Sequence, residues 1–433
     1  MSTTVKQNIK NVSLLIAGKD VKLETDNGDY NSGLELKKAN SGLADNNILR
    51  ADGKGTISVN GKDWTGELKD AEEIDGKDTG KGVQTAINGG KAVNYGNITI
   101  KYDPDKNSQN KGWGHSGQTA RKNSEVYNYG TMTSREMVQR AELNSSAYNY
   151  GTLIGTHVQY AGNNGRVYNY GTIKTGSHGQ NILNDSLAVN YGIIIGAGES
   201  GQGVNGSNSI LKNYGVIATD SQRGQNSVGT ENIKIYNYGI IANKGNKQLV
   251  GLGQVLNSKN GSGFNYGLII NDGHLGQRLA GENSEIYNYG LIANKGKAGQ
   301  EIQGKNNTGY NYGIIANSDT AGQYAAGDKG GNKAINYGII ANVGNDGQLA
   351  TAGAIAENYG IIANTGGYGQ KSYGVISEET LNILNNGIIN NNGGYGMYTG
   401  DDLEHKGENN GIVFNYINKP VLYGNITNNG VTI

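Results

Sequence analysis

The segment Asn311-Tyr-Gly-Ile-Ile-Ala-Asn317, followed by Gly322-Gln323, decides the fold because versions of it recur along most of the chain. The triplet Asn-Tyr-Gly occurs twelve times, and after a first gap of 34 residues its spacing stays between 20 and 28. A Gly-Gln pair follows many of these triplets eleven residues later. Self-similarity with a period of about 20–50 residues is typical of solenoids and related arrays. The triplets begin at Asn94, Asn128, Asn149, Asn169, Asn190, Asn213, Asn237, Asn265, Asn288, Asn311, Asn336 and Asn358.

Aligning the repeats on the triplet asparagine gives a strand pattern. The residue two positions earlier is small or aliphatic, and the residue four positions later is always apolar, as at Ile292, Ile315 and Ile340. The position just before the asparagine tolerates charge, as at Lys212 and Glu357. Such period-two alternation indicates a strand with one buried face. The small residue, the Asn, the Gly and the Ile are expected inside, and both tyrosines are expected outside.

The expected inward position of the asparagine has an energetic consequence. An unsatisfied buried amide costs about 1–3 kcal/mol, so each asparagine needs partners. Identical asparagines stacked on successive turns can hydrogen-bond to one another as an amide ladder. The glycine after the tyrosine favours a tight bend or a left-handed backbone conformation.

These patterns predict an all-β chain folded as a parallel β-helix, expected to be right-handed, with rungs of 20–25 residues. One strand face cannot be buried within a single repeat, but stacked turns bury it. We expect an N-terminal cap region at 1–90, the Asn-Tyr-Gly β-helix at 91–371, and degenerate rungs at 372–433. In that last region Asn-Asn-Gly replaces the triplet, as at Asn385-Asn-Gly387 and Asn409-Asn-Gly411.

Composition excludes several classes of function. Lys and Arg number 37 and so do Asp and Glu, which gives zero net charge. A nucleic-acid partner is therefore not expected, because such binders need a basic surface. No run approaches the ~18 apolar residues that would span a bilayer, so we expect no membrane insertion of this fragment. The absence of Cys excludes disulfides and thiolate metal sites and fits export through an oxidising compartment.

The repeat Asn-Tyr-Gly-Ile-Ile-Ala-Asn…Gly-Gln, with its Asn-Asn-Gly-Ile tail, resembles the β-helical passenger regions of bacterial autotransporter-type surface proteins and adhesins. The resemblance covers roughly residues 90–433. It implies bacterial export to the cell surface or extracellular space, with an adhesive or self-associating role in virulence. It names no particular receptor. The signal peptide and the outer-membrane translocator barrel of that family are not found in the sequence, so we interpret the chain as a mature or excised piece.

Parallel β-helices also occur in enzymes that degrade polysaccharides and in phage-type tailspikes, which need clustered carboxylates or a basic residue on one sheet. Asp220, Asp272 and Asp319 fall near one turn without aligning, and Arg223 and Arg278 are scattered. Gly196-Ala-Gly-Glu-Ser-Gly201 matches a dinucleotide-binding pattern, but no helix is expected after it. We therefore expect no enzymatic activity and no cofactor.

Histidines are the remaining candidates for a metal site. Four of the five lie near the Gly-Gln column or its equivalent: His115, His157, His178 and His274. His157 and His178 fall on consecutive rungs and are expected about 5 Å apart. No further ligand aligns with this pair, so we expect no bound metal.

The tyrosines are the most informative candidates for function, since the chain has 28 Tyr but 2 Phe and 2 Trp. Stacked rings would stabilise one rung against the next, and an exposed aromatic row would also serve as a contact surface. The candidate contact stripe consists of Tyr238, Tyr266, Tyr289, Tyr312, Tyr337 and Tyr359.

The predicted function is a non-enzymatic cell-surface adhesin, a rigid β-helical rod that mediates adhesion or self-association. Expected partners are a receptor protein, a glycan or copies of the same chain. The alternatives are a β-helical polysaccharide-degrading enzyme, a phage-type tailspike, and the subunit of a self-assembling surface filament.

Overall fold

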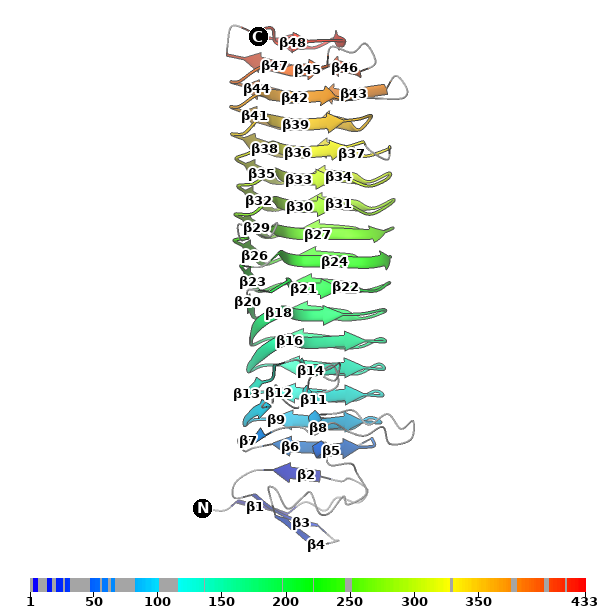
Figure 1. Cartoon of the computed structure of the whole chain (residues 1–433), viewed down its shortest axis with the longest axis vertical. Helices are drawn as coiled ribbons and strands as arrows, with labels where there is room; N and C mark the ends of the chain where they lie inside the picture. Colours follow the sequence, from blue (N-terminus) through cyan, green and yellow to red (C-terminus); the bar gives the residue numbers. More distant parts are fainter. Residues whose placement is uncertain are drawn as a thin grey trace, which may run out of the picture. The chain divides into compact units, whose positions relative to one another are not determined.

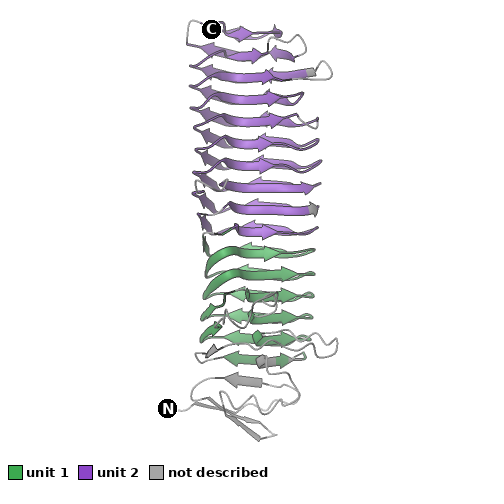
Figure 2. Ribbon diagram, in the orientation of Figure 1, with its two compact units in different colours: residues 1–198 green, residues 199–433 purple. Residues whose placement is uncertain are grey.

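The computed structural model describes residues 82–100 and 116–433, except 136, 197, 221, 246–250, 328–329, 375–379, 401–404 and 417–418. Before residue 82 it describes 3–6, 14–17, 21–25, 28–31, 47–54, 57–60 and 64–66. Every regular element in these residues is a β-strand. The chain divides into two compact units, Met1–Gly198 and Glu199–Ile433 (Figure 2).

The second unit is a parallel β-solenoid in which most turns contribute one strand to each of three ladders (Figure 1). The first ladder carries the triplet asparagines and consists of β22 (Ile210–Asn213), β25 (Lys234–Asn237), β28 (Ser262–Asn265), β31 (Glu285–Asn288), β34 (Thr308–Asn311), β37 (Lys333–Asn336), β40 (Ile355–Asn358), β43 (Thr380–Asn385), β46 (His405–Asn409) and β49 (Ile426–Asn428). The second ladder carries the core isoleucines and consists of β23 (Val216–Thr219), β26 (Ile240–Asn243), β29 (Leu268–Asn271), β32 (Leu291–Asn294), β35 (Ile314–Asn317), β38 (Ile339–Asn342), β41 (Ile361–Asn364), β44 (Ile388–Asn391), β47 (Ile412–Asn415) and β50 (Val431–Thr432). The third ladder carries most of the Gly-Gln pairs and consists of β21 (Ser200–Val204), β24 (Arg223–Glu231), β27 (Leu252–Lys259), β30 (Leu275–Leu279), β33 (Ala298–Ile302), β36 (Ala321–Ala326), β39 (Asp346–Thr351), β42 (Tyr368–Tyr373), β45 (Met397–Thr399) and β48 (Leu422–Tyr423).

The first unit repeats the three ladders. Its first ladder consists of β2 (Leu14–Ala17), β6 (Ile57–Asn60), β9 (Lys91–Asn94), β12 (Glu125–Asn128), β15 (Ser146–Asn149), β17 (Arg166–Asn169) and β19 (Leu187–Asn190). Its second ladder consists of β7 (Trp64–Gly66), β10 (Asn97–Ile100), β13 (Thr131–Thr133), β20 (Ile193–Gly196) and the first halves of β16 (Thr152–Gly162) and β18 (Thr172–Ile182). Its third ladder consists of β5 (Asn47–Asp52), β8 (Gly82–Ile87), β11 (Ser116–Arg121), β14 (Met137–Glu142) and the second halves of β16 and β18.

Some strands of the region expected as a cap, residues 1–90, already belong to the solenoid. β5 pairs with β8, and β6 pairs with β9, both in parallel. A separate small sheet contains β1 (Thr3–Lys6), β3 (Val21–Thr25) and β4 (Gly28–Asn31). Much of 1–90 lies outside the described residues, so the cap itself stays a prediction. The degenerate region 372–433 continues all three ladders through parallel pairs such as β44 with β47.

The predicted inside and outside of the repeat are confirmed except at the triplet glycine and the inner tyrosine, which are half-buried. Register places Asn288 beside Asn311 and Ile292 beside Ile315, so equivalent positions stack from turn to turn. The core isoleucines and the triplet asparagines are buried, whereas the tyrosine after each asparagine is exposed. Burying one such aliphatic side chain per turn stabilises the fold by about 1.5–3 kcal/mol.

The predicted asparagine ladder is present in each unit. The amide nitrogens of eleven triplet asparagines donate to the amide oxygen of the asparagine on the following turn, with N–O distances of 2.7–2.9 Å. The same nitrogen also lies near a backbone carbonyl, for example 3.2 Å from the Ile314 oxygen for Asn288. The buried amides are therefore satisfied, as their position requires.

A second amide ladder, formed by the glutamines of the Gly-Gln pairs, was not predicted. Gln300 Nε2 donates to Gln277 Oε1 at 3.1 Å and also reaches the Tyr310 carbonyl oxygen of the first ladder at 3.3 Å. In this ladder a glutamine donates to the glutamine of the preceding turn. In the asparagine ladder an asparagine donates to the asparagine of the following turn. The preceding glycine leaves room for the core isoleucine, since a Cβ on Gly299 would lie 2.2 Å from Ile315 Cγ2.

Of the two alternatives predicted for the triplet glycine, the tight bend is present and the left-handed conformation is not. Positive φ angles occur instead in the turn before the first ladder, at residues such as Asn283 (φ 50°) and Asn306 (φ 54°). Asparagine tolerates this conformation better than most residues. The triplet glycine is required because successive turns approach closely: a Cβ on Gly313 would lie 2.1 Å from the Gly290 carbonyl oxygen.

Candidate contact surface

The six predicted stripe tyrosines lie in one continuous row at the corner between the first and second ladders of the second unit. Together with Tyr214 they form the outer tyrosine column, whose members are 40–45% exposed. Consecutive ring centroids are 4.7–5.0 Å apart and the ring planes are within 16° of parallel. The structure thus brings together all residues of the predicted stripe.

This stacking decides which part of each ring a partner can reach. A ring in the middle of the column, such as Tyr312, has a neighbouring ring on both faces at 5.0 Å. Its exposed part is therefore the ring edge with the hydroxyl group. Sugars usually dock on the open face of an aromatic ring, and within the column such faces are covered. The geometry favours a partner that packs along ring edges.

A second, inner aromatic column runs beside part of the first and widens the surface. Tyr236, Phe264, Tyr287 and Tyr310 stack at 4.9–5.0 Å. Each lies 6.1–6.2 Å from the outer ring of its own turn. The hydroxyl of Tyr287 donates to Glu285 Oε2 at 2.6 Å. Burial, and then this hydrogen bond, raises the pKa of Tyr287 far above its usual value, so the hydroxyl stays neutral.

The first unit carries a matching outer tyrosine column, but the residue two positions after the tyrosine differs. Tyr95, Tyr129, Tyr150, Tyr170 and Tyr191 stack at 4.8–5.1 Å. Three turns there place a threonine two residues after the tyrosine, at Thr131, Thr152 and Thr172. The second unit places an aliphatic residue there instead.

That aliphatic column is the feature that sequence reasoning missed. Outward-facing residues of the second ladder include Ile240, Leu291, Ile314, Ile339, Ile361 and Ile388, each 37–42% exposed. The signal was present as two adjacent aliphatic residues after each Asn-Tyr-Gly triplet of the second unit. Strands that are apolar on both faces are usually covered on both faces. A strand that is covered on one face alternates apolar and polar residues along its sequence. An exposed apolar surface of this kind marks an interaction site.

The candidates for catalysis and metal binding do not converge. His157 and His178 stack at 5.1 Å with a 42° tilt, as the spacing predicted. Asp220 pairs with Lys244 at 3.8 Å, and Asp272 pairs with Lys295 at 2.9 Å. Within the described part of the chain, no three His, Cys, Asp or Glu side chains lie close enough to hold a metal ion. His115 lies outside the described residues.

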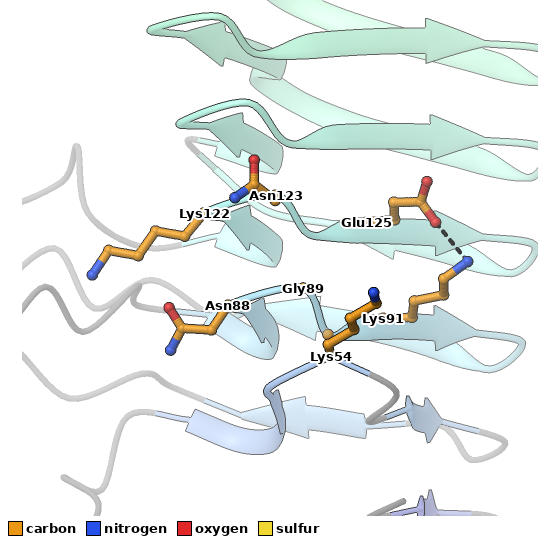
Figure 3. A pocket seen from close by; sticks show the side chains of 8 residues that line it. Lys54, Asn88, Gly89, Lys91, Lys122, Asn123 and Glu125 are labelled. Carbon is orange, nitrogen blue, oxygen red and sulfur yellow. Dashed lines mark ion pairs between the residues drawn. The ribbon is translucent and has the colours of Figure 1, made fainter.

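A hollow in the first unit has a volume of about 950 Å³ and is lined by Lys54, Asn88, Gly89, Gly90, Lys91, Lys122, Asn123 and Glu125 (Figure 3). Glu125 forms an ion pair with Lys91 at 2.8 Å. The side chain of Lys122 points away from Lys54 and Lys91. The hollow therefore does not gather several charges onto one point, as a catalytic or anion-binding site would.

Asp346 is a buried carboxyl group in a position where the two preceding turns carry alanine, Ala298 and Ala321. It stacks between Ala321 and Tyr368 and is 3% exposed. Its Oδ1 has no hydrogen-bond partner. Burial raises the pKa of Asp346 from 3.8 to about 6, although Lys371 and a backbone hydrogen bond from Tyr368 act in the opposite direction.

We expect Asp346→Ala to stabilise the protein at neutral pH. Because the folded-state pKa lies above the unfolded value, the folded chain holds more protons between pH 4 and 6, and stability falls as the pH rises through that window. The variant should gain about 2–3 kcal/mol above pH 7 and little at pH 4. Thermal melts at both pH values measure this. An equal change at both would show that the carboxyl does not titrate as described.

Comparisons of the chain with protein-family models, curated proteins and solved structures found no match. Among the described residues, none of the elements is a helix long and apolar enough to cross a lipid bilayer. Interpretation of the surface therefore rests on its geometry.

Proposed function

We propose that this chain is a non-enzymatic, exported bacterial surface protein that adheres to a partner through the outer tyrosine column of its second unit. The observation that carries the proposal is the continuous row of stacked tyrosines, each at least 40% exposed. Tyrosine is enriched where proteins bind one another, because it offers a large apolar area with a hydroxyl at its edge. The partner class that fits best is a protein on another cell.

Two further observations support adhesion. The inner column doubles the aromatic width beside Tyr238, Tyr266, Tyr289 and Tyr312. The aliphatic column lies two residues beyond each tyrosine and continues the apolar surface. A partner would contact three apolar columns at once, which is a wide enough surface for several anchoring contacts.

We expect changing Tyr289, Tyr312 and Tyr337 together to Ser to abolish adhesion to cells while the β-rich fold persists. Three neighbouring turns span about 10 Å along the stack, since rungs lie ~4.8 Å apart. Losing several aromatic anchors costs an interface several kcal/mol. Cell binding and thermal melting of the same variant are the two measurements.

The two readouts separate a contact role from a structural one. If the column served only to stabilise the stack, the variant would melt lower and still bind. Retained binding with reduced stability would remove the column as the contact site. Aromatic pairs contribute about 0.5–1.5 kcal/mol each, so a fall in melting temperature accompanies either outcome and cell binding decides between them.

A further inference from the structure

The second ladder of the second unit presents two parallel outward columns of different height. The higher one, the ridge, consists of Ile240, Leu268, Leu291, Ile314, Ile339, Ile361 and Ile388. The lower one, the groove, lies two residues later and consists of Ala242, Ile270, Ala293, Ala316, Ala341, Ala363 and Asn390. Ridge and groove carry no charged residue, so two identical faces would not repel one another.

We propose that this face pairs with the same face of a second copy of the chain, ridge into groove. A ridge of isoleucines beside a groove of alanines is complementary to itself when one copy is rotated by 180°. Self-complementary patches of this kind form two-fold dimers. The proposal goes beyond adhesion through the tyrosines, since it assigns a second copy of the chain as the partner of the aliphatic column and of the alanine column beside it.

The geometry selects one arrangement. A two-fold axis that runs along the stacking direction, midway between ridge and groove, places Ile339 opposite Ala341 of the second copy and Ala341 opposite its Ile339. The ridge of each copy then packs into the groove of the other copy. A two-fold axis along the strands would leave each ridge facing the other ridge. The dimer is therefore parallel, with each turn facing the same turn of the other copy.

The repeat distance also favours a second copy over an unrelated partner. Turns recur at the ~4.8 Å spacing of β-strands, so a partner stays in step along the whole face only if it has the same period. The four turns from Leu291 to Asn364 keep the Ile and Ala pattern without interruption. Ile270 stands where alanine would complete the groove, and it marks one end of the complementary stretch.

The expected contact is small. Strands of four residues are about 13 Å long, and the four complementary turns extend about 19 Å, which gives roughly 250 Å² per copy. Stable dimers bury about 800 Å² per partner. The dimer is therefore weak, and it forms only at high protein concentration.

Sedimentation velocity of the full chain over a range of concentrations tests the proposal. We expect a reversible shift from monomer to dimer, which Ile314→Lys with Ile339→Lys abolishes. Thr131→Lys with Thr152→Lys, at the same repeat position in the first unit, is the matched control and should leave the dimer unchanged. A wild-type chain that stays monomeric throughout would overturn the proposal.

A second variant separates ridge-into-groove packing from general apolar adhesion or attachment to lipid. Ala316→Leu with Ala341→Leu makes the face more apolar but fills the groove. We expect at least a tenfold weaker dimer, with an unchanged melting temperature. Equal or stronger association, or binding to phosphatidylcholine vesicles in place of dimer formation, would contradict the packing described.

The parallel register has its own test because the chain contains no Cys. A short bismaleimide should link Ile339→Cys to Ala341→Cys on separate copies, but not Ile339→Cys to Ala242→Cys, which lies four turns away. The opposite pattern would exclude the parallel dimer. Adhesion through the tyrosines is measured separately by cell binding, so a wild-type chain that adheres to cells but never forms the dimer refutes only this inference.

Discussion

Replacing Gly313 with alanine is expected to destabilise the second unit severely. The added Cβ would lie 2.1 Å from the carbonyl oxygen of Gly290 and 2.7 Å from backbone atoms of Tyr289. Backbone atoms held in a ladder cannot move aside, so the two turns must separate. That separation breaks the 2.8 Å hydrogen bond from Asn288 to Asn311 and the ring stacking beside it. We expect a loss of about 3 kcal/mol or more, measured by thermal or denaturant unfolding.

Gly400 provides the matched control in the same unit. A Cβ there would meet nothing closer than 3.8 Å, and its φ is not in the left-handed region. Gly400→Ala should change stability by less than about 1 kcal/mol. If Gly313→Ala melted like Gly400→Ala, the close approach of successive turns would be wrong.

Replacing Ile315 with aspartate is expected to be equally severe. Ile315 is fully buried between Ile292 and Ile340 of adjacent turns. A carboxylate there has no cation to pair with, and burying an unpaired charge costs several kcal/mol. We expect a loss of about 4 kcal/mol or more. Thermal melting of Ile315→Asp measures this loss.

The neighbouring outward position provides the contrast. Leu291 is 37% exposed, and the same column already holds Thr131, Thr152 and Thr172 in the first unit. Leu291→Thr should therefore be mild. A melting temperature for Ile315→Asp within a few degrees of the unmodified protein would overturn the assignment of inward and outward positions.

Much of the architecture could be predicted because the repeats can be aligned and the residues at each position compared. Twelve copies show that the position of Ile292 is never polar while the position of Tyr287 tolerates Lys212 and Glu357. Such a contrast fixes which face is buried. The requirement that a buried amide be paired then predicts the asparagine ladder.

The glutamine ladder could not be predicted in the same way. Gln300 is satisfied by Gln277 and by the carbonyl of Tyr310, which belongs to a different ladder across the core. Sequence alone does not show which strand lies opposite, so a polar side chain beside glycine is naturally placed in a turn. The close approach at the triplet glycine could not be predicted for a related reason, since the obstacle to a side chain at Gly313 is the preceding turn.

The contact surface was predicted only in part. The tyrosines stood out because the same aromatic residue recurs at one outward position. The aliphatic column was hidden because Ile314 directly precedes the buried Ile315, and adjacent isoleucines look like one core. Only the exposed fraction of each side chain separates them.

Cell adhesion of two matched triple variants tests the central claim most directly. One carries Ser at Tyr289, Tyr312 and Tyr337 of the second unit, and the other carries Ser at Tyr129, Tyr150 and Tyr170 of the first unit. Both remove three stacked, exposed rings from an outer column, so both should lose similar stability. The proposed function predicts that only the first variant loses adhesion, because the three first-unit tyrosines lie beside Thr131, Thr152 and Thr172 instead of the aliphatic column. Equal adhesion by both variants, whether retained or lost, would contradict it.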